Sequence, residues 1–266
     1  MSTVMMEVSR LLDDPSTSTS ALGELVGKDQ ALTTKILSIA NSPLYGLPRK
    51  VSTIDFAILI IGYQDIKNIV IALSMIESFK NKTDEYLNQK EFWLHSVLTG
   101  IAAKKMSDDM GYRIGSEAFV GGLLHDLGIP VMHKYFHTNF MEIVNNVKNS
   151  GKAFLSAEVE ALGYTHQDIG RFLAEKWNLP DNLATAIQYH EAPSQLENEN
   201  ILAAIIHLAD YATHKLQVGT YYYDDKIELD SKIIKTLKFA SEVELNDFID
   251  QYKQPFEEEI KNTKFL

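Results

Sequence analysis

Helical periodicity runs through almost the whole chain, and the strict alternation of apolar and polar residues that marks a strand is almost absent. Apolar residues recur at spacings of three and four in nearly every long segment, with glycines, prolines and capping residues between the segments. A helix with such an apolar stripe must bury it against another element. The sequence therefore predicts an all-α fold.

The predicted helices follow one another closely along the chain. They cover residues 4–13, 18–27, 31–40, 53–61, 64–79, 91–109, 116–126, 130–149, 153–161, 166–177, 180–190 and 199–217. Thr53 and Ser116 are the expected N-terminal caps of two of them. The tail beyond them is amphipathic but irregular, and Tyr221–Tyr223 is expected to be a short extended piece.

The composition limits the class of protein. A chain of 266 residues with 45% hydrophobic content can bury a sizeable core, and it lacks the run of about 18 apolar residues that a membrane span needs. Its N-terminus lacks the basic-then-apolar layout of a signal peptide. The formal net charge of −11 argues against a general affinity for nucleic acid or anionic membranes. We therefore expect a soluble cytoplasmic protein that binds neither.

Residues 18–40 could be mistaken for a helix-turn-helix DNA reader. The second of these helices offers only Lys35 as a cation on its expected outer face, and Lys28 lies in the turn. A helix that enters a DNA groove normally carries more positive charge than this. The charge pattern therefore argues against DNA binding.

A histidine and an aspartate stand side by side where an apolar helix ends, in the sequence GGLLHDLG over residues 121–128. The chain has no cysteine, so a metal ion would have to be held by histidine and carboxylate side chains. His125 offers a borderline nitrogen, and Asp126 offers a hard oxygen that could bridge two ions. A single His-Asp pair is weak evidence, because such pairs also occur on solvated surfaces.

Two further residues face the predicted core. His95 lies within the apolar stripe of its helix, and Asp210 shares a stripe with His207 and His214. A carboxylate that faces a core without a partner costs several kcal/mol, so Asp210 needs a cation or a strong donor. His95 could instead be a hydrogen-bonded core histidine, and His207, one turn back, could be the local partner of Asp210.

The remaining histidines carry less information when each is taken singly. His166 begins a predicted helix and His190 ends another, where a capping or exposed position is the simpler interpretation. His133, His137 and His214 show no partner pattern, and we interpret them as surface or packing residues.

The order of these motifs resembles that of the HD superfamily of metal-dependent phosphohydrolases, and more closely its HD-related output domain (HDOD) family. The motifs are FWLH over residues 92–95, LLHDLG over 123–128, HQDIG over 166–170, WNLP over 177–180, YHEAP over 189–193 and HLAD over 207–210. Segments 29–37, 40–46 and 57–62 look like the leading helices of that family. The resemblance covers about residues 5–215.

The resemblance implies a domain organisation. An HD-domain-like helical bundle over residues 91–215 would follow an N-terminal helical part over about residues 1–80, and together they would form an HDOD domain over residues 1–215. Residues 216–266 would then be a C-terminal helical extension. From the resemblance we would also expect a leading segment with prolines, and by that comparison it is cut short before Val4.

The resemblance also implies a set of metal ligands. The positions that match the ligands of the HD superfamily are His95, His125, Asp126 and Asp210 for one ion, and those that match a second ion in the HD-GYP branch are His166 and His190. The cofactor would be one or two divalent transition-metal ions. Fe or Mn suit these ligands best, Zn or Ni are also compatible, and Mg suits four histidines poorly.

The chain departs from the catalytic HD-GYP branch at three points. Glu191 follows His190 where that branch has a second histidine, and Ile129 and Pro130 follow Gly128 where a basic residue is often placed. No Gly-Tyr-Pro tripeptide occurs. A cation near the metals would stabilise charge that develops on a phosphoryl group, so its absence disfavours cleavage of cyclic dinucleotides.

The preferred interpretation is a regulatory output module of bacterial signal transduction that binds signalling proteins and contains a His/Asp metal site. The alternative is an active metal-dependent phosphohydrolase, either a phosphodiesterase or a nucleotide phosphatase, with the attacking water near Asp126. A phosphate-containing small molecule would then be the ligand. The tail with Tyr221–Tyr223 could also dock on another copy of the chain and form a homo-oligomer.

Overall fold

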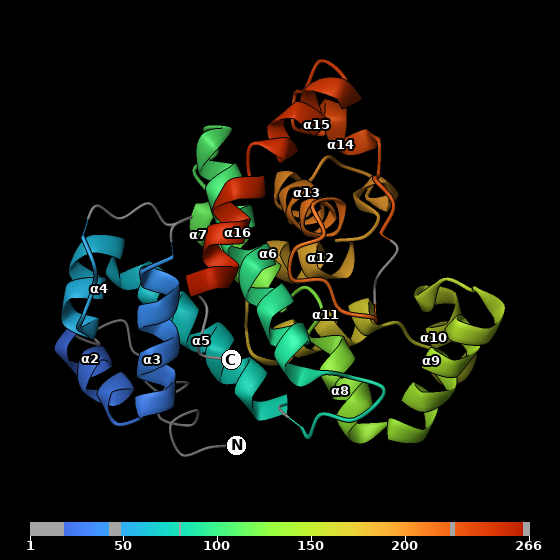
Figure 1. The fold of residues 1–266 in the computed structure, drawn as a ribbon, viewed down its shortest axis with the longest axis horizontal. Coiled ribbons are helices and arrows are strands. Elements are labelled where there is room, and N and C mark those ends of the chain that lie inside the picture. The colour runs from blue at the N-terminus through green and yellow to red at the C-terminus, as the bar shows by residue number, and fades with distance from the viewer. Residues whose placement is uncertain (1–18, 43–48, 80, 224–226, 263–266) are drawn as a thin grey trace.

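The computed structural model describes residues 19–42, 49–79, 81–223 and 227–262, and every regular element within these ranges is a helix (Figure 1). The predicted all-α fold is therefore confirmed. The predicted helix over residues 4–13 and the motif residues Tyr45 and Gly46 lie outside the described residues. Among the helices that are described, none is both long and apolar enough to cross a membrane.

The elements follow the predicted order with small shifts at their ends. They are α2 (Thr19–Gly27), α3 (Gln30–Ala40), α4 (Ile54–Ile61), α5 (Tyr63–Phe79), α6 (Gln89–Asp109), α7 (Gly115–Leu124), α8 (Gly128–Tyr135), α9 (His137–Ser150), α10 (Phe154–Leu162), α11 (His166–Lys176), α12 (Asp181–Gln188), the 3-10 turn η2 (Pro193–Gln195), α13 (Ile201–Lys215), α14 (Lys232–Thr236), α15 (Glu242–Asp250) and α16 (Lys253–Asn262).

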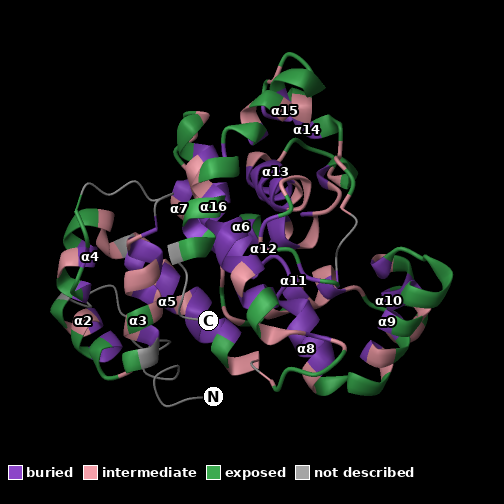
Figure 2. Ribbon diagram, viewed as in Figure 1, coloured by how far each residue is buried: buried purple, intermediate pink, exposed green. Residues whose placement is uncertain are grey.

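The helices are arranged around a central group formed by α6, α7, α12 and α13 (Figure 1). Helices α2–α5 pack on one side of this group, and the α9–α10 pair projects on the other (Figure 1). The longest buried stretches lie in α6, in α7 with its continuation into α8, and in α13 (Figure 2). The division into an HDOD domain over residues 1–215 and an extension over 216–266 stays a prediction.

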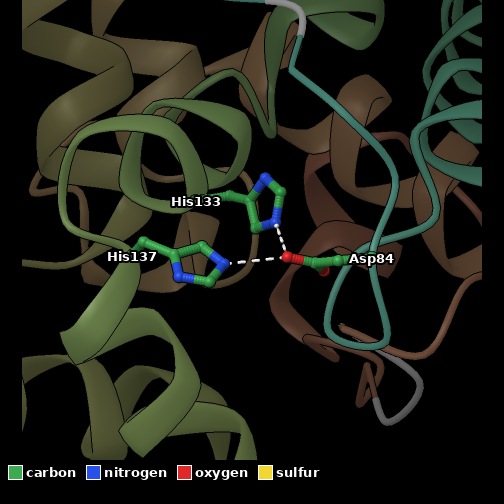
Figure 3. Close-up of side chains that lie close together, drawn as sticks. All are labelled: Asp84, His133 and His137. Carbon is green, nitrogen blue, oxygen red and sulfur yellow. Dashed lines mark hydrogen bonds and ion pairs between the residues drawn. The ribbon is translucent and has the colours of Figure 1, made fainter.

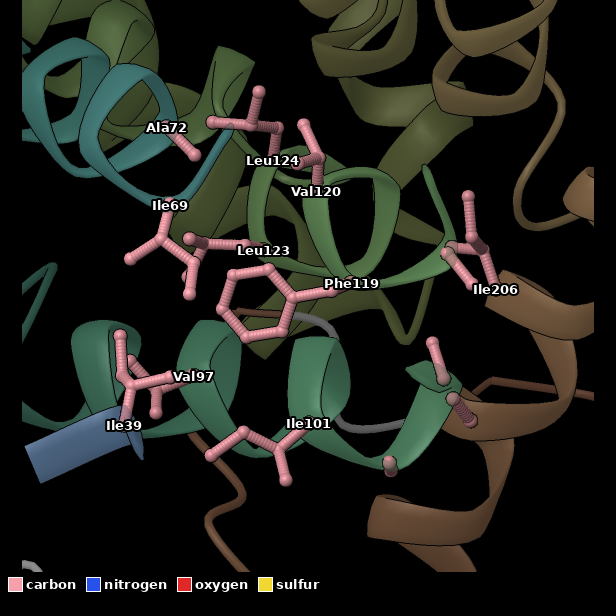
Figure 4. Close-up of a cluster of buried hydrophobic side chains, with 14 of the residues drawn as sticks. Ile39, Ile69, Ala72, Val97, Ile101, Phe119, Val120, Leu123, Leu124 and Ile206 are labelled. Atoms are coloured by element: carbon pink, nitrogen blue, oxygen red, sulfur yellow. The ribbon is translucent and has the colours of Figure 1, made fainter. Parts of the chain in front are cut away.

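The main apolar core joins the N-terminal helices to the central group. Ile39 of α3, Ile69 of α5, Val97 of α6, Phe119 of α7 and Ile206 of α13 belong to this core (Figure 4). Each of these side chains is at most 4% exposed. Burying a side chain of this size stabilises the folded state by about 1.5–3 kcal/mol. The contacts of α7 with α5 and with α6 therefore hold the N-terminal helices against the central group.

Two local predictions about helix ends are wrong. Ser116 does not cap α7, because the helix begins at Gly115, and the Ser116 hydroxyl instead accepts a 2.9 Å hydrogen bond from the Asn68 side chain of α5. The predicted helix over residues 130–149 is broken at Phe136, whose φ and ψ of −126° and 42° are not helical. By contrast, Thr53 caps α4 as predicted, by accepting a hydrogen bond from the Phe56 N–H.

Lys35 does not lie on an exposed outer face of α3. Its side chain is 15% exposed, forms an ion pair with Glu77 of α5, and lies 4.5 Å from the centre of the Trp93 ring. The expectation about its position is therefore wrong, because Glu77 of α5 and Trp93 of α6 lie against this side of α3. The cation that a DNA-reading helix would present is already engaged by a carboxylate and an aromatic ring.

Tyr252, between α15 and α16, connects the tail to α6. Its hydroxyl donates a 2.5 Å hydrogen bond to Asp109 Oδ2, and its side chain is buried. Burial, together with the hydrogen bond and the negative charge of Asp109, raises the pKa of Tyr252 well above its usual range. The folded protein therefore holds this tyrosine neutral at a pH at which the unfolded chain would ionise it.

We predict a loss of stability at alkaline pH that depends on Tyr252. Above about pH 10 only the unfolded state releases the proton, so the free energy of unfolding falls by up to about 1.4 kcal/mol per pH unit from this group. Urea unfolding between pH 9 and 11 should show a steeper decline for the wild type than for Tyr252→Phe. Tyr164→Phe, at an exposed position, is the control; parallel curves for wild type and Tyr252→Phe would contradict the assignment.

Candidate metal centre

The six residues predicted as ligands converge where α6, α7, α11, α12 and α13 meet. His95 comes from α6, His125 and Asp126 directly follow α7, His166 begins α11, His190 follows α12 and Asp210 lies in α13. All six are at most 1% exposed. The proximity that the sequence motifs imply is therefore present, while the metal-binding role of the six residues stays a prediction.

One half of the cluster surrounds His95 and His125. Their Nε2 atoms lie 3.3 Å apart, and His95 Nε2 is 3.1 Å from Asp210 Oδ1. His125 Nε2 is 3.1 Å from Asp126 Oδ2. Two nitrogens bound to one tetrahedral zinc-like ion at about 2.0–2.1 Å would be about 3.3–3.4 Å apart, so these distances suit ligands of a common ion.

The other half of the cluster surrounds the second oxygen of Asp126. Asp126 Oδ1 lies 3.4 Å from His166 Nε2 and 3.4 Å from His190 Nε2. Glu191 Oε1 lies 3.3 Å from His166 Nε2 on the same side. Asp126 therefore stands between two ligand groups with one carboxylate oxygen facing each, which is the position of a bridging ligand.

Close backbone contacts set the spacing of these side chains. A Cβ atom on Gly122 would lie 2.8 Å from the carbonyl oxygen of Thr99, so α7 and α6 can approach this closely only with glycine. A Cβ atom on Gly128 would overlap the carbonyl oxygen of His166 and lie 2.7 Å from its carbonyl carbon. The glycine that ends the His-Asp motif therefore allows α11 to bring His166 to Asp126.

Hydrogen bonds at the far side of three rings orient their Nε2 atoms toward the centre. His125 Nδ1 and His190 Nδ1 each lie 2.7 Å from a backbone carbonyl oxygen, of Gly122 and Ile187 respectively. His166 Nδ1 lies 2.9 Å from Glu158 Oε1. A partner for the second ring nitrogen is characteristic of metal-binding histidines, because it fixes the tautomer that leaves Nε2 free for the ion.

The buried carboxylates are stabilised by imidazoles. Burial works to raise the pKa of Asp126, but the His125, His190 and His166 rings outweigh it and hold the pKa well below its usual range. Burial lowers the pKa of His125, but the charges of Asp126 and Asp210 outweigh it and raise that pKa to about 9. Among the described residues, the ion-pair partners of both aspartates are all histidines.

The polar atoms of this cluster fit a metal ion. Seven buried atoms of its residues have no hydrogen-bond partner among the described residues, and they are His95 Nδ1, His166 Nε2, His190 Nε2, His214 Nε2, Asp126 Oδ1 and both oxygens of Asp210. An unpartnered buried polar group is costly and needs an explanation. Apart from His95 Nδ1, on the far side of a ring whose Nε2 faces His125 and Asp210, a divalent cation would satisfy these atoms and replace the protons on the imidazoles.

Comparison with known families identifies the chain. The HDOD domain matches residues 1–193, which is more than two thirds of the length of this chain. The chain belongs to the HDOD family. The match ends before the last predicted motif, so α13 with Asp210 lies beyond the matched residues, although the fold places it in the same cluster.

Similar proteins support the HDOD fold without supplying a function. An HDOD domain protein of unknown function from Geobacter sulfurreducens is 22% identical, with a TM-score of 0.77 over 99% of this chain and 91% of the other. A protein from Shewanella amazonensis SB2B, provisionally named a phosphohydrolase, is 22% identical, with a TM-score of 0.74 over 97% and 92%. An uncharacterized protein of Treponema pallidum is 23% identical over 96% of this chain, which spans only 49% of that relative's length.

The structure adds four residues to the cluster around Asp126 that sequence reasoning missed. Glu158 of α10 supports His166, and Tyr223 donates a 2.7 Å hydrogen bond to Glu158 Oε1. Tyr221 donates a hydrogen bond to Asp126 Oδ2. His214, interpreted above as a surface or packing residue, places Nε2 3.6 Å from Asp210 Oδ1. Its spacing of four residues from Asp210 was the one signal that could have revealed it.

Three further expectations about this region change in whole or in part. His207 does not partner Asp210, because its Nδ1 donates to the His190 carbonyl and its Nε2 accepts from the Asp230 N–H. Tyr221–Tyr223 is not an extended piece, because it forms a bend in which Tyr221 and Tyr223 are buried within the same chain, while docking of the tail on another copy stays a prediction. His133 and His137 are a packing and a surface residue, as expected, but they share a partner, Asp84, that the sequence pattern did not show.

Proposed function

We propose that this chain is a regulatory output module of bacterial signal transduction whose buried His/Asp centre holds one or two transition-metal ions. The observation that carries the proposal is that the ligand set is nearly complete and yet shielded from solvent. All six predicted ligands are at most 1% exposed. Function in proteins with this fold has to be argued from the site, and a site without access favours a structural or regulatory metal over a catalytic one.

Tyr221 is the residue that covers the centre. Its hydroxyl donates to Asp126 Oδ2, the oxygen that also lies near His125. Its ring centre lies 5.0 Å from that of His95 and 5.7 Å from that of Phe92. A phosphoester that reached Asp126 Oδ2 would have to displace this ring and break its hydrogen bond. This side of the centre is therefore closed to substrate in this conformation.

The proposed ligands divide into two groups around Asp126. His95, His125 and Asp210 would share one ion with Asp126, and His166, His190 and Glu191 would hold the other. Fe or Mn is the proposed metal, with Zn or Ni as compatible alternatives, since imidazole and carboxylate together suit these ions. When bound, such ions can polarise a phosphoryl group and lower the pKa of a water; here they would mainly neutralise buried carboxylates and tie five helices together.

A second candidate, metal-dependent phosphohydrolase activity, is favoured by one observation. The side chain of Glu191 is 18% exposed, so the His166 end of the cluster is its most open part. Glu191 also fills the position at which the catalytic branch has a histidine, so the second ligand group is not lost. A small phosphate-containing molecule could be recognised from this end, which lies on the side of Asp126 opposite the Tyr221 hydrogen bond.

The partner of the proposed module is a signalling protein rather than a nucleic acid. A net charge of −11 repels phosphate backbones, and Lys35 of α3 is engaged by Glu77 and Trp93. Binding to DNA, if it occurred, would weaken steeply with salt, which a titration at two salt concentrations would show.

A turnover screen separates the two candidates. The protein is loaded with Mn²⁺ or Fe²⁺ and assayed against phosphodiesters, cyclic dinucleotides and nucleotides, alongside Tyr221→Ala, Tyr222→Ala and Asp126→Asn. We expect the wild type to retain metal without turnover. We also expect a chelator to remove the ion at least about tenfold faster from Tyr221→Ala than from Tyr222→Ala, because Tyr221 is hydrogen-bonded to Asp126 whereas Tyr222 is exposed. Wild-type turnover that Asp126→Asn abolishes would overturn the regulatory proposal.

A further inference from the structure

A second group of potential metal ligands lies outside the buried centre. Asp84, in the segment between α5 and α6, faces His133 of α8 and His137 at the start of α9 (Figure 3). Asp84 Oδ2 is 2.9 Å from His133 Nε2 and 2.8 Å from His137 Nε2. One ligand atom from each residue lies within 4.8 Å of the others. None of the three belongs to the ligand set around Asp126.

Backbone N–H groups hold one of the two carboxylate oxygens of Asp84. Its Oδ1 accepts hydrogen bonds from the Tyr86 N–H at 2.8 Å and the Leu87 N–H at 3.0 Å. This arrangement occupies one carboxylate oxygen and leaves Oδ2 facing the two imidazoles. The carboxylate is therefore oriented before any ion arrives.

The two histidines are also positioned by their surroundings. His133 is 1% exposed, and its ring centre lies 5.2 Å from that of Phe140 in an edge contact. His137 lies 6.2 Å from the Tyr86 ring, again in an edge contact. The break between α8 and α9 at Phe136 places both Nε2 atoms on the same carboxylate oxygen. The side chains of Asp84, His133 and His137 are therefore all positioned by contacts with their neighbours.

Asn81 can support metal binding at His133. Its side-chain Nδ2 lies 3.4 Å from His133 Nδ1. Since an amide can present either its oxygen or its nitrogen, Asn81 can accept from Nδ1–H and so leave the Nε2 lone pair to an ion. Two imidazoles and one carboxylate, with a further position open to water, are a ligand set that Zn²⁺ uses in proteins.

We propose that Asp84, His133 and His137 bind a divalent transition-metal ion, for which Zn²⁺ is the natural probe, and that the ion fastens the segment before α6 to the α8–α9 junction. Unlike the buried centre, this site is reachable, since the side chains of His137 and Asp84 are 44% and 32% exposed. The ion would connect the end of the N-terminal helices to α8, which begins two residues after Asp126.

Zn²⁺ titration of the chelator-treated full chain tests the proposal. The variants are Asp84→Asn, which keeps an acceptor for Tyr86 and Leu87 but loses the charge, and His137→Ala at the more exposed ligand. Calorimetry should show one Zn²⁺ fewer per chain, or at least about tenfold weaker binding of one ion, in both variants. Glu142→Gln, at an exposed carboxylate of α9, should behave as the wild type.

Asp126→Asn separates this site from the buried centre. The Zn²⁺ binding event that is lost in Asp84→Asn should persist in Asp126→Asn, and Zn²⁺ should slow hydrogen exchange of residues 81–88 in that variant. If circular dichroism shows that Asp84→Asn is unfolded, the result for His137→Ala alone decides whether the proposal holds. Equal Zn²⁺ stoichiometry and affinity in the wild type and in every folded variant at Asp84 and His137 would overturn the proposal, because the three residues would then form only a hydrogen-bonded group.

Discussion

Addition of Mn²⁺ or Fe²⁺ to the metal-free protein should raise its Tm by roughly 5–10 °C, and Asp126→Asn should remove most of that rise. A ligand at 100 times its Kd adds about 2.7 kcal/mol, and for a chain of this size each kcal/mol shifts Tm by about 2–4 °C. Asp126 is the residue whose two oxygens face both ligand groups, so its loss weakens both. Differential scanning calorimetry with metal analysis of the same samples gives the measurement.

The controls distinguish the buried centre from other sites. Asp247→Asn, at an exposed aspartate of α15, should keep the full rise, because it removes a carboxylate without touching the cluster. Asp84→Asn should also keep it, since its proposed site lies elsewhere. If metal raises the Tm of wild type and Asp126→Asn equally, or if neither metal binds, the six residues are not ligands of Mn²⁺ or Fe²⁺.

Gly128→Ala should lower the free energy of unfolding by about 3 kcal/mol, at the upper end of the usual cost of inserting a methyl group into a packed site. The added Cβ would overlap the His166 carbonyl group, which is backbone and cannot move aside as a flexible side chain can. The start of α11 must then move away from α8. That movement separates His166 from Asp126, so metal affinity should also fall, by at least about tenfold.

Gly27→Ala is the matched control for this prediction. A Cβ atom on Gly27 would meet nothing within 4 Å, and its φ lies outside the left-handed region. The free energy of unfolding should therefore be unchanged or rise by up to about 1 kcal/mol. Urea denaturation of both variants gives the comparison. A loss at Gly128 of less than about 0.5 kcal/mol would show that the α8–α11 contact can relax without harm.

Much of the fold could be predicted because its signals are local. The stripe of apolar residues that defines α13 and the Thr53 cap of α4 act over one or two turns, and the observed helices follow them within a few residues. The wrong predictions concern features that are not local. The break at Phe136 and the missing Ser116 cap depend on what packs against α8 and α7, which no local pattern reports.

The candidate centre was reached from the sequence by a different route. The periodicity argument placed His95 and Asp210 in the core, but it left His166 and His190 as capping or exposed positions. Only the order of motifs, through its resemblance to the HDOD family, grouped all six. Glu158 escaped this reasoning because its role depends on contacts between α10 and α11 that the spacing of motifs does not encode.

The sequence by itself determined that the chain is helical and, since it has no cysteine, that any metal must be held by histidines and carboxylates. Only the tertiary structure decided that Tyr221 covers Asp126, 95 residues before it, and that Asp84 lies beside His133 and His137. Caps and periodicity reflect forces that act within a few residues. Which side chains meet across the molecule depends instead on how closely helix faces pack, and that is settled jointly by all the buried contacts.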